Sequence, residues 1–303
     1  MKALAATAAR GNSRAAQGTE LIAGTSLRGQ ITQIAEAAGA SALAVGFFDF
    51  RHQTEWSFHP DRWFHAASTI KVPVLLGVFA AIEQGGITEF SRVHVRNRFY
   101  SIVDGSPFRI DISRDSTPEV HEAIGKTLQV RELARHMIVT SSNLATNLLI
   151  DIVGIERIQQ TLRDLGLDHG IDFKRGVEDN LAWEQDINNC VTADGLLTAL
   201  RMIAEEKAIS PAASLHMLDI LHGQEFKRGI PAGLPTEARV AHKTGEISTV
   251  AHDAGIVYLP DREPYVLVIL TEWKPNSTGR QDTIARISRA VYQHVTEGDG
   301  ASE

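Results

Sequence analysis

Segments with the pattern of β-strands lie only near the two ends of this chain of 303 residues. Residues 41–50 read as a buried strand, and residues 51–58 follow as its more polar hairpin partner. Three further strand-like segments lie near the C-terminus and are joined by turns: 238–244, 253–259 and 265–273. Because strands satisfy their backbone hydrogen bonds by pairing with one another, both ends of the chain should meet in one sheet. The order of elements therefore predicts an α+β fold with a five-stranded antiparallel sheet and a large insertion.

Helical periodicity dominates the rest of the chain. Apolar residues recur at helical spacing in 27–38 and in 277–295, which places a helix at each end of the predicted sheet. The insertion is expected to be helical throughout, with helices over 71–84, 127–139, 143–153, 155–165 and 192–205. We therefore expect an α/β lobe formed by 26–62 and 226–303, and an all-helical lobe formed by 63–225.

Two segments lack this patterning. Residues 167–191 show no periodicity and are expected to form a long loop, which is uncommon in a compact domain unless the loop is functional. Residues 1–25 are expected to form a disordered polar leader. A signal peptide is not clear there, because the weakly apolar stretch after Lys2 is short and ends at Arg10.

The composition is that of an ordinary soluble globular protein, with 43% hydrophobic and 22% charged residues. A net charge of −7, without a cluster of Lys or Arg, argues against nucleic-acid and anionic-membrane partners. No apolar run approaches the length that spans a bilayer. The single cysteine, Cys190, excludes an internal disulfide, and the 12 histidines show no spacing typical of a metal site. We therefore expect neither a metal nor a cofactor.

The stretch Ser68-Thr69-Ile70-Lys71 places a hydroxyl and an amine three residues apart, where an apolar helical run begins. Three residues is nearly one helical turn, so Ser68 and Lys71 would share one face. A serine hydroxyl needs a neighbouring base to act as a nucleophile. A lysine is that base only if burial or a nearby cation lowers its pKa. The same spacing also occurs in ordinary solvated helices, so its meaning depends on the rest of the chain.

Two more polar triplets follow at wide spacing: Ser141-Ser142-Asn143 and Lys243-Thr244-Gly245. Together with the serine–lysine pair, they resemble in type and order the active-site motifs of the class A β-lactamases and penicillin-binding proteins. The resemblance runs from about residue 26 to 296 and includes the context of each motif: Phe64, Asn147, 232–235 and 252–257. It implies a two-lobed fold with the active site in the cleft between a helical lobe and a sheet edge.

The resemblance also implies catalytic roles. Ser68 is the expected nucleophile, Lys71 its base or part of a relay to it, and Ser141 a proton donor to the leaving nitrogen. Lys243, if it approaches the same pocket, would help to hold Lys71 partly neutral by repulsion between like charges. The backbone N–H groups of Ser68 and Glu246 are the expected oxyanion hole.

The remaining motif residues are expected to bind the substrate. Asn143 carries both a donor and an acceptor, which suits it to hold a substrate amide and to orient Lys71. Thr244 would hydrogen-bond a substrate carboxylate, to which Lys243 adds positive charge. Gly245 lets the strand edge approach the substrate closely.

The chain departs from the family pattern at several positions. The second motif usually has an aspartate where Ser142 stands, a position that supports the fold more than the chemistry. The strand after Lys243 has Ala251 where the family often offers an arginine to the substrate carboxylate, and Arg228 is a candidate replacement. Glu246 places a negative charge beside the substrate strand, which should disfavour anionic side groups on the substrate.

Class A enzymes carry a glutamate in the long loop that activates the water for deacylation. Glu178 is the candidate here, with Asp179 and Glu184 as alternatives, and each carboxylate is equally compatible with a solvated loop position. The leucine–asparagine pair that follows this glutamate in the family is absent. A misplaced base would slow the attack of water by about 10²–10⁴-fold, and the enzyme would then acylate readily but deacylate slowly.

The resemblance thus predicts a serine hydrolase of the class A β-lactamase type, which hydrolyses β-lactams through an acyl-Ser68 intermediate and contributes to antibiotic resistance. Two alternatives stay open: a peptidase or esterase for D-Ala-D-Ala-like peptides or small esters, and a penicillin-binding sensor that is acylated without turnover. The expected partner is a small molecule and the expected state a monomer. The family implies a periplasmic or secreted location, whereas the lack of a clear signal peptide leaves the cytoplasm open.

Overall fold

A five-stranded antiparallel sheet forms the centre of the fold, with the strand order β10-β11-β12-β1-β2. The computed structural model describes residues 26–300, so the predicted leader over 1–25 lies outside the described residues. The strands are β1 (Ala42–Asp49), β2 (Thr54–Phe58), β10 (Arg239–Ile247), β11 (Val250–Tyr258) and β12 (Tyr265–Glu272). β1 pairs with both β2 and β12, and Val45 lies opposite Ile269. Both ends of the chain therefore complete one sheet, and the predicted fold class is confirmed.

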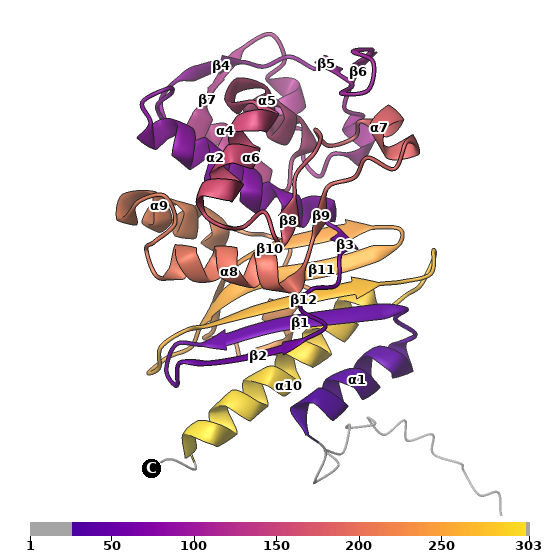
Figure 1. Cartoon of the computed structure of the whole chain (residues 1–303), viewed down its shortest axis with the longest axis vertical. Helices are drawn as coiled ribbons and strands as arrows, with labels where there is room; N and C mark the ends of the chain where they lie inside the picture. The colour runs from indigo at the N-terminus through magenta and orange to yellow at the C-terminus, as the bar shows by residue number, and fades with distance from the viewer. Residues whose placement is uncertain (1–25, 301–303) are drawn as a thin grey trace, which may run out of the picture.

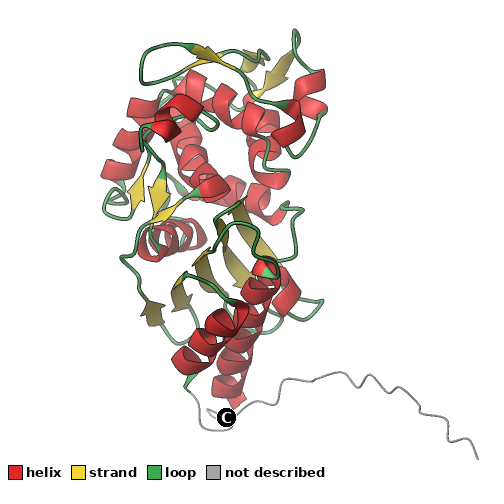
Figure 2. Cartoon of the chain, turned by 90° about the vertical axis from the view of Figure 1, so that its right-hand side faces the viewer, coloured by secondary structure: helices red, strands yellow, loops and turns green. Residues whose placement is uncertain are grey.

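Helices cover both faces of this sheet (Figures 1 and 2). The terminal helices α1 (Leu27–Ala38) and α10 (Arg280–Gly300) lie on one face, and α8 (Ala193–Ala204) and α9 (Pro211–His222) lie on the other. Alternate side chains of β12 point to opposite faces of the sheet. Leu267 packs with the terminal helices, whereas Val268 packs with the larger core on the opposite side. Burial on both faces explains why the strand is apolar at nearly every position.

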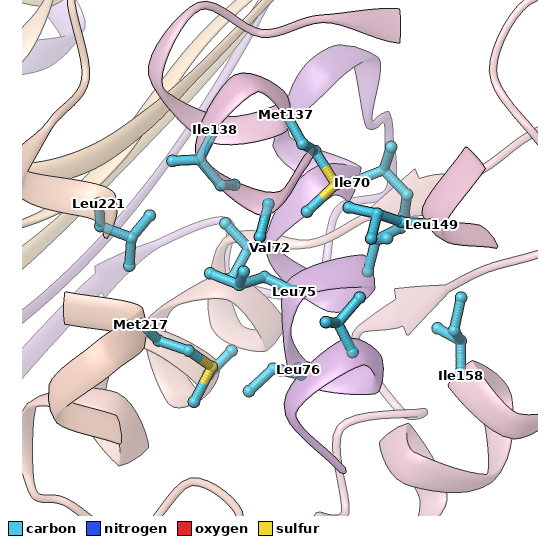
Figure 3. Close-up of a cluster of buried hydrophobic side chains, with 14 of the residues drawn as sticks. Ile70, Val72, Leu75, Leu76, Met137, Ile138, Leu149, Ile158, Met217 and Leu221 are labelled. Atoms are coloured by element: carbon cyan, nitrogen blue, oxygen red, sulfur yellow. The ribbon is translucent and has the colours of Figure 1, made fainter. Parts of the chain in front are cut away.

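The helical part of the chain is organised around α2. Its helices are α2 (Lys71–Glu83), α3 (Glu119–Glu122), α4 (Val130–Val139), α5 (Asn143–Val153) and α6 (Ile155–Asp164). α2 is buried along most of its length, and Leu75 and Leu76 pack in the core shown in Figure 3. Gly77 permits close packing with α6, because a Cβ there would lie 2.7 Å from Cγ1 of Ile158. This packing holds the first residue of α2, Lys71, in place.

The expectation that residues 63–225 are helical throughout is wrong. Short strands lie among the helices: β3 (Phe64–His65), β4 (Arg92–His94), β5 (Phe99–Tyr100), β6 (Pro107–Phe108), β7 (Thr127–Gln129), β8 (Ile171–Asp172) and β9 (Cys190–Val191). The structure also contains three short 3₁₀ helices among the described residues: η1 (Ala67–Ile70), η2 (Ile112–Arg114) and η3 (Ile230–Gly233). Strands this short contain about one period of alternation, so the sequence pattern does not reveal them. The predicted lobe boundaries at 62 and 225 stay a prediction.

The aperiodic segment 167–191 contains the short strands β8 and β9, and the loop between these strands carries the short helix α7 (Asn180–Glu184). Arg175 Nη2 donates to Asn188 Oδ1 at 2.9 Å, and Asn189 Nδ2 donates to the Arg175 carbonyl at 2.9 Å. Gly195 in α8 contacts the start of the loop so closely that a Cβ there would lie 2.4 Å from the Gly170 carbonyl oxygen. These contacts hold the loop together and pack its start against α8. No helix in the described part of the chain is long and apolar enough to cross a membrane.

Candidate active site

Ser68 lies in η1, the turn that leads from β3 into α2. The preceding residue, Ala67, has a φ of +45°, a conformation that side chains with a Cβ rarely adopt. His65 supports this turn, because the Ala67 N–H donates to His65 Nδ1 at 3.0 Å. Burial, and then the positive charge of Arg175, lower the pKa of His65, so the ring stays neutral and Nδ1 can accept. The serine turn is therefore held by a side chain outside the motif.

The sheet meets this turn at β10. A Cβ on Gly245 would lie 2.9 Å from the backbone nitrogen of Thr69 and 3.1 Å from that of Ser68. Backbone atoms cannot swing aside as a flexible side chain can, so glycine is required at this point of contact. The third motif thus borders the first.

Lys71 Nζ donates three hydrogen bonds: to the Ser141 carbonyl oxygen at 2.6 Å, to Ser141 Oγ at 2.9 Å and to Asn143 Oδ1 at 2.8 Å. The side chain is fully buried. The protonated form has three N–H donors, and these oxygens occupy all of them, whereas the uncharged amine has two N–H donors and a lone pair. The second motif therefore surrounds the amine that the first motif supplies.

Burial lowers the pKa of Lys71 to about 7, against the opposing effect of the negative charges on Asp115 and Glu178. An ordinary lysine has a pKa of about 10.4 and is almost entirely protonated at neutral pH. The uncharged amine of Lys71 is therefore well populated near pH 7. This is the property that a base for the Ser68 hydroxyl requires.

Lys243 is a second fully buried amine, in β10. Its Nζ donates to the carbonyl oxygen of Thr244 at 2.9 Å. Burial, and then the positive charge of Lys71, lower the pKa of Lys243 well below its usual value. The two amines are thus close enough for their charges to interact.

The second motif forms the turn before α5. Ser141 has a φ of +59°, and Ser142 Oγ accepts a backbone N–H from the first turn of the helix at 3.2 Å. One turn later, Asn147 exchanges two hydrogen bonds with the backbone of Val177 in the loop, each of 2.9 Å. α5 therefore connects the motif at its start to the loop that carries the candidate carboxylates.

Glu178 reaches the site from that loop. It has a φ of +61°, and its Oε1 accepts a hydrogen bond from Asn143 Nδ2 at 2.7 Å. Asn143 thus contacts Glu178 through its amide nitrogen and Lys71 through its amide oxygen. A cavity of about 620 Å³ beside them is lined by Ser68, Asn143 and Glu178, among others.

The two alternative carboxylates are placed differently. The buried carboxylate of Asp179 accepts the N–H of Ile102 at 3.0 Å and caps α7 by accepting the N–H of Ala182 at 3.2 Å. Glu184 is exposed in the last turn of α7. In the described part of the chain, neither residue lines the cavity beside Ser68.

The cleft continues past Ser68 into a second cavity of about 440 Å³. Thr244 and Arg228 line it together, and Arg228 is exposed there. A hydroxyl and a guanidinium in one cavity suit the binding of a substrate carboxylate. The expectation that Arg228 replaces the missing family arginine is therefore compatible with its position.

Glu246 also lines both cavities, but its charge is paired. Arg280 Nη2 and Gln281 Nε2, both from α10, donate to its carboxylate oxygens at 2.6 and 2.7 Å. The repulsion of anionic substrate groups that the sequence predicted is consequently offset by Arg280.

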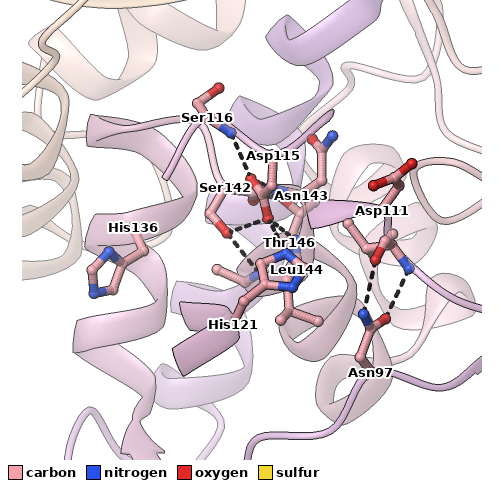
Figure 4. Close-up of polar contacts among 12 residues, drawn as sticks. Asn97, Asp111, Asp115, Ser116, His121, His136, Ser142, Asn143, Leu144 and Thr146 are labelled. Atoms are coloured by element: carbon pink, nitrogen blue, oxygen red, sulfur yellow. Dashed lines mark hydrogen bonds and ion pairs between the residues drawn. The ribbon is translucent and has the colours of Figure 1, made fainter. Parts of the chain in front are cut away.

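Asp115 is a residue of this region that the sequence motifs did not reveal. Its carboxylate accepts the backbone N–H groups of Asn143 at 2.9 Å and Leu144 at 3.0 Å (Figure 4). The only available signal was indirect: Ser142 stands where the family has an aspartate, so a carboxylate from elsewhere could have been sought.

The structure places a buried amine with a pKa of about 7 against the Ser141 hydroxyl and Asn143, and Asn143 in turn against the Glu178 carboxylate. Ser68 lines the same cavity as Glu178, although no hydrogen bond between described residues joins its hydroxyl to Lys71. Groups of these types are the ones that acyl transfer needs. Among the described residues, no three His, Cys, Asp or Glu side chains are grouped so that they could hold a metal ion.

Comparisons with known proteins agree with this arrangement. A family model described as "Beta-lactamase enzyme family" matches residues 26–295. A β-lactamase from Bacillus amyloliquefaciens is 30% identical over 76% of this chain and 71% of its own length. One from Bacteroides uniformis is 30% identical over 55% of this chain and 60% of its own length. The solved structure of PBP-A has a TM-score of 0.77 and 27% identity, and the match covers 89% of this chain and 96% of PBP-A. A mutant of PBP-A was solved as an acyl-enzyme complex with penicillin G.

Proposed function

Because the chain belongs to the β-lactamase enzyme family, we propose that it is a serine β-lactamase of the class A type, which opens the β-lactam amide through an acyl-Ser68 intermediate. The observation that carries this proposal is the buried Lys71 amine. Its pKa of about 7 and its hydrogen bonds to Ser141 and Asn143 make it a base at the start of the helix that follows Ser68.

Acylation begins with the transfer of the Ser68 proton to neutral Lys71. The Ser68 oxygen attacks the lactam carbonyl, and the negative charge that develops on the carbonyl oxygen is stabilised by the backbone N–H groups of Ser68 and Glu246. The carbon–nitrogen bond then breaks. The proton passes from Lys71 through Ser141 Oγ to the leaving nitrogen, a route supported by the 2.9 Å hydrogen bond between these two side chains.

Glu178 is the proposed base for deacylation. Its carboxylate lines the same cavity as Ser68 and is oriented by Asn143 Nδ2. It takes a proton from a water molecule, whose oxygen attacks the acyl carbon and releases Ser68. Thr244 and Arg228 line the adjoining cavity and bind the substrate carboxylate there, and the fully buried Lys243, next to Thr244 in β10, adds positive charge when it is protonated.

The second candidate is a penicillin-binding protein that forms a long-lived acyl adduct. Both oxygens of Glu178 already have partners, because the Asp111 N–H also contacts Oε2 at 3.5 Å. A carboxylate engaged in this way is less available to water. The similarity to PBP-A also favours this candidate.

Intact-protein mass after mixing with penicillin G, recorded alongside turnover of a chromogenic cephalosporin, tests both candidates. Turnover that is lost in Ser68→Ala supports the serine β-lactamase. A stable mass increase without turnover, also lost in Ser68→Ala, supports the long-lived adduct. Neither signal in the parent protein would overturn both and direct the search to other acyl substrates.

Replacing Glu178 with glutamine should leave acylation intact and slow deacylation by about 10²–10⁴-fold, the usual contribution of a general base. The acyl-enzyme mass should then accumulate during the reaction with penicillin G. Glu184→Gln is the matched control, because Glu184 is exposed and lies in the same loop. Unchanged turnover in Glu178→Gln would exclude Glu178 as the base.

The rate of Ser68 acylation should fall as the pH decreases below about 7. Burial lowers the pKa of Lys71 to about 7, and only the uncharged amine accepts the Ser68 proton. The uncharged fraction decreases about tenfold for each pH unit below the pKa. The acid limb of the pH–rate profile is the part below the pKa, in which the rate falls as the pH decreases. Single-turnover acylation, measured by quenched mass spectrometry from about pH 5 to 9, shows this limb directly. A rate that is constant through neutral pH would contradict the role of Lys71.

A further inference from the structure

The carboxylate of Asp115 is buried and fully engaged at the start of α5. Its side chain has 0% exposure, and Oδ1 accepts the N–H groups of Asn143 at 2.9 Å and Ser116 at 3.0 Å. Oδ2 accepts the Leu144 N–H at 3.0 Å and the Ser142 hydroxyl at 3.1 Å. A buried carboxylate is costly unless such donors satisfy it, so this degree of engagement identifies a specific structural role.

The position of this carboxylate suits a negative charge. α5 spans 11 residues, and its first N–H groups, those of Asn143 and Leu144, have no partner within the helix. Asp115 accepts both of them and also meets the positive end of the helix dipole. His121 Nε2 contacts the same carboxylate at 3.1 Å, as Figure 4 shows. Asp115 therefore ties the turn formed by residues 141–143 to a loop outside the motifs.

The same turn holds Lys71. All three hydrogen bonds from Lys71 Nζ end on Ser141 and Asn143, the residues on either side of Ser142. A shift of the turn would consequently move the partners of the amine. The charge of Asp115 acts on Lys71 as well, because it raises the pKa of Lys71 against the lowering effect of burial.

We propose that Asp115 is a positioning residue, which fixes the turn of residues 141–143 around Lys71 and stabilises the positive charge that Lys71 carries after it takes the Ser68 proton. The proposal rests on the proposed acyl-Ser68 chemistry. It explains how the second motif works with Ser142 at its centre, since the carboxylate comes from Asp115 instead.

Other charged groups around this region are distributed over several elements. His121 in α3 faces Asp115, and Glu178 in the loop and Lys243 in β10 face Lys71. Arg114 precedes Asp115 and lines the cavity beside Ser68. None of these residues changes in the test below, so their contributions cancel between the parent and the variants.

The first test is Asp115→Asn, which keeps the shape and removes the charge. Acylation by penicillin G at neutral pH should fall by up to about 100-fold, the effect of a misplacement of about 1 Å. The acid limb of acylation should also move to lower pH, because loss of the carboxylate charge lowers the pKa of Lys71. An effect on packing alone would lower the rate without moving the limb. Asp104→Asn, at an exposed aspartate in the turn between β5 and β6, is the matched control.

The second test moves the carboxylate within the cluster. Ser142 Oγ lies 3.1 Å from Asp115 Oδ2, so the double variant Asp115→Ser with Ser142→Asp returns a carboxylate to nearly the same place. An aspartate also caps a helix as well as a serine does. This double variant should recover most of the acylation rate that Asp115→Ser loses, and its acid limb should match that of the parent. A double variant no faster than Asp115→Ser would overturn the proposal.

A measurement without substrate separates this proposal from the proposed function. The titration of Lys71, followed by NMR with ε-¹³C-labelled lysine, should move to lower pH in Asp115→Asn and return in the double variant. If Asp115→Asn does not fold, the comparison of the double variant with the parent decides: equal titration supports the proposal, and a shifted titration overturns it. If the parent is not acylated by penicillin G, the proposed function fails, while the titration of Lys71 still tests Asp115.

Discussion

Lys71→Gln should acylate about 10²–10⁴-fold more slowly than the parent protein, the range expected for loss of a general base. Glutamine is one atom shorter than lysine but keeps an unbranched apolar stem and an N–H donor, so the core around α2 should stay intact. It cannot accept the Ser68 proton, however. Single-turnover acylation by penicillin G, measured by mass, gives the rate constant for the comparison.

Three further variants complete this test. Lys71→Arg should be equally slow, because an arginine remains charged at all accessible pH values. Lys207→Gln removes an exposed lysine and should leave the rate unchanged. Groups that act as one unit show non-additive losses, so Ser68→Ala should lose no more activity when Lys71→Gln is added. Acylation of Lys71→Gln at the parental rate would mean that another group is the base.

Gly245→Ala should reduce acylation by about 100-fold, the effect of displacing reacting groups by about 1 Å. A Cβ at this position would lie 2.9 Å from Thr69 N and 3.1 Å from Ser68 N, so either β10 or the serine turn must move. Overpacking of this kind also costs about 1–3 kcal/mol of stability. The acylation rate and the thermal unfolding midpoint of the same sample measure the two effects.

Gly86→Ala is the matched control for Gly245→Ala. The nearest atom to a Cβ at Gly86 is Arg157 Nη1 at 3.4 Å, which is ordinary contact with a flexible side chain. This variant should keep both the parental rate and the parental unfolding midpoint. If Gly245→Ala behaved in the same way, the close contact of β10 with the serine turn would not be needed for acylation.

The spacing of residues along the chain predicted the elements with clear periods. The strand 265–273 and the helix 143–153 were predicted within one residue of β12 and α5, because a continuous apolar run and a helical period are local properties. The α+β fold with its five-stranded sheet followed from the order of these elements. The two-residue strand β3 and the capping of α7 by Asp179 were not predicted, because they depend on contacts between distant segments.

The candidate site shows the same division. The motifs predicted Ser68, Lys71 and Asn143 as site residues from their types, their order and the resemblance to the family, and the structure places Lys71 against Asn143 and Ser68 beside the same cavity as Asn143. The sequence left three loop carboxylates open, and the fold brings Glu178 to the cavity while it buries Asp179 as a helix cap. A loop without periodicity carries no local information about which side chain points inward.

Two properties of the site depend wholly on packing between distant segments. The pKa of Lys71 is about 7 because α2 is buried by helices that lie far along the chain, and burial removes water from the amine. Asp115 lies 28 residues before Asn143, yet the fold places its carboxylate on the Asn143 N–H. Residue types and their spacing therefore predicted the candidate reacting groups. Only the packed structure decides the protonation of Lys71 and brings the Asp115 carboxylate to the turn around it, because desolvation and long-range contacts arise from the assembled core.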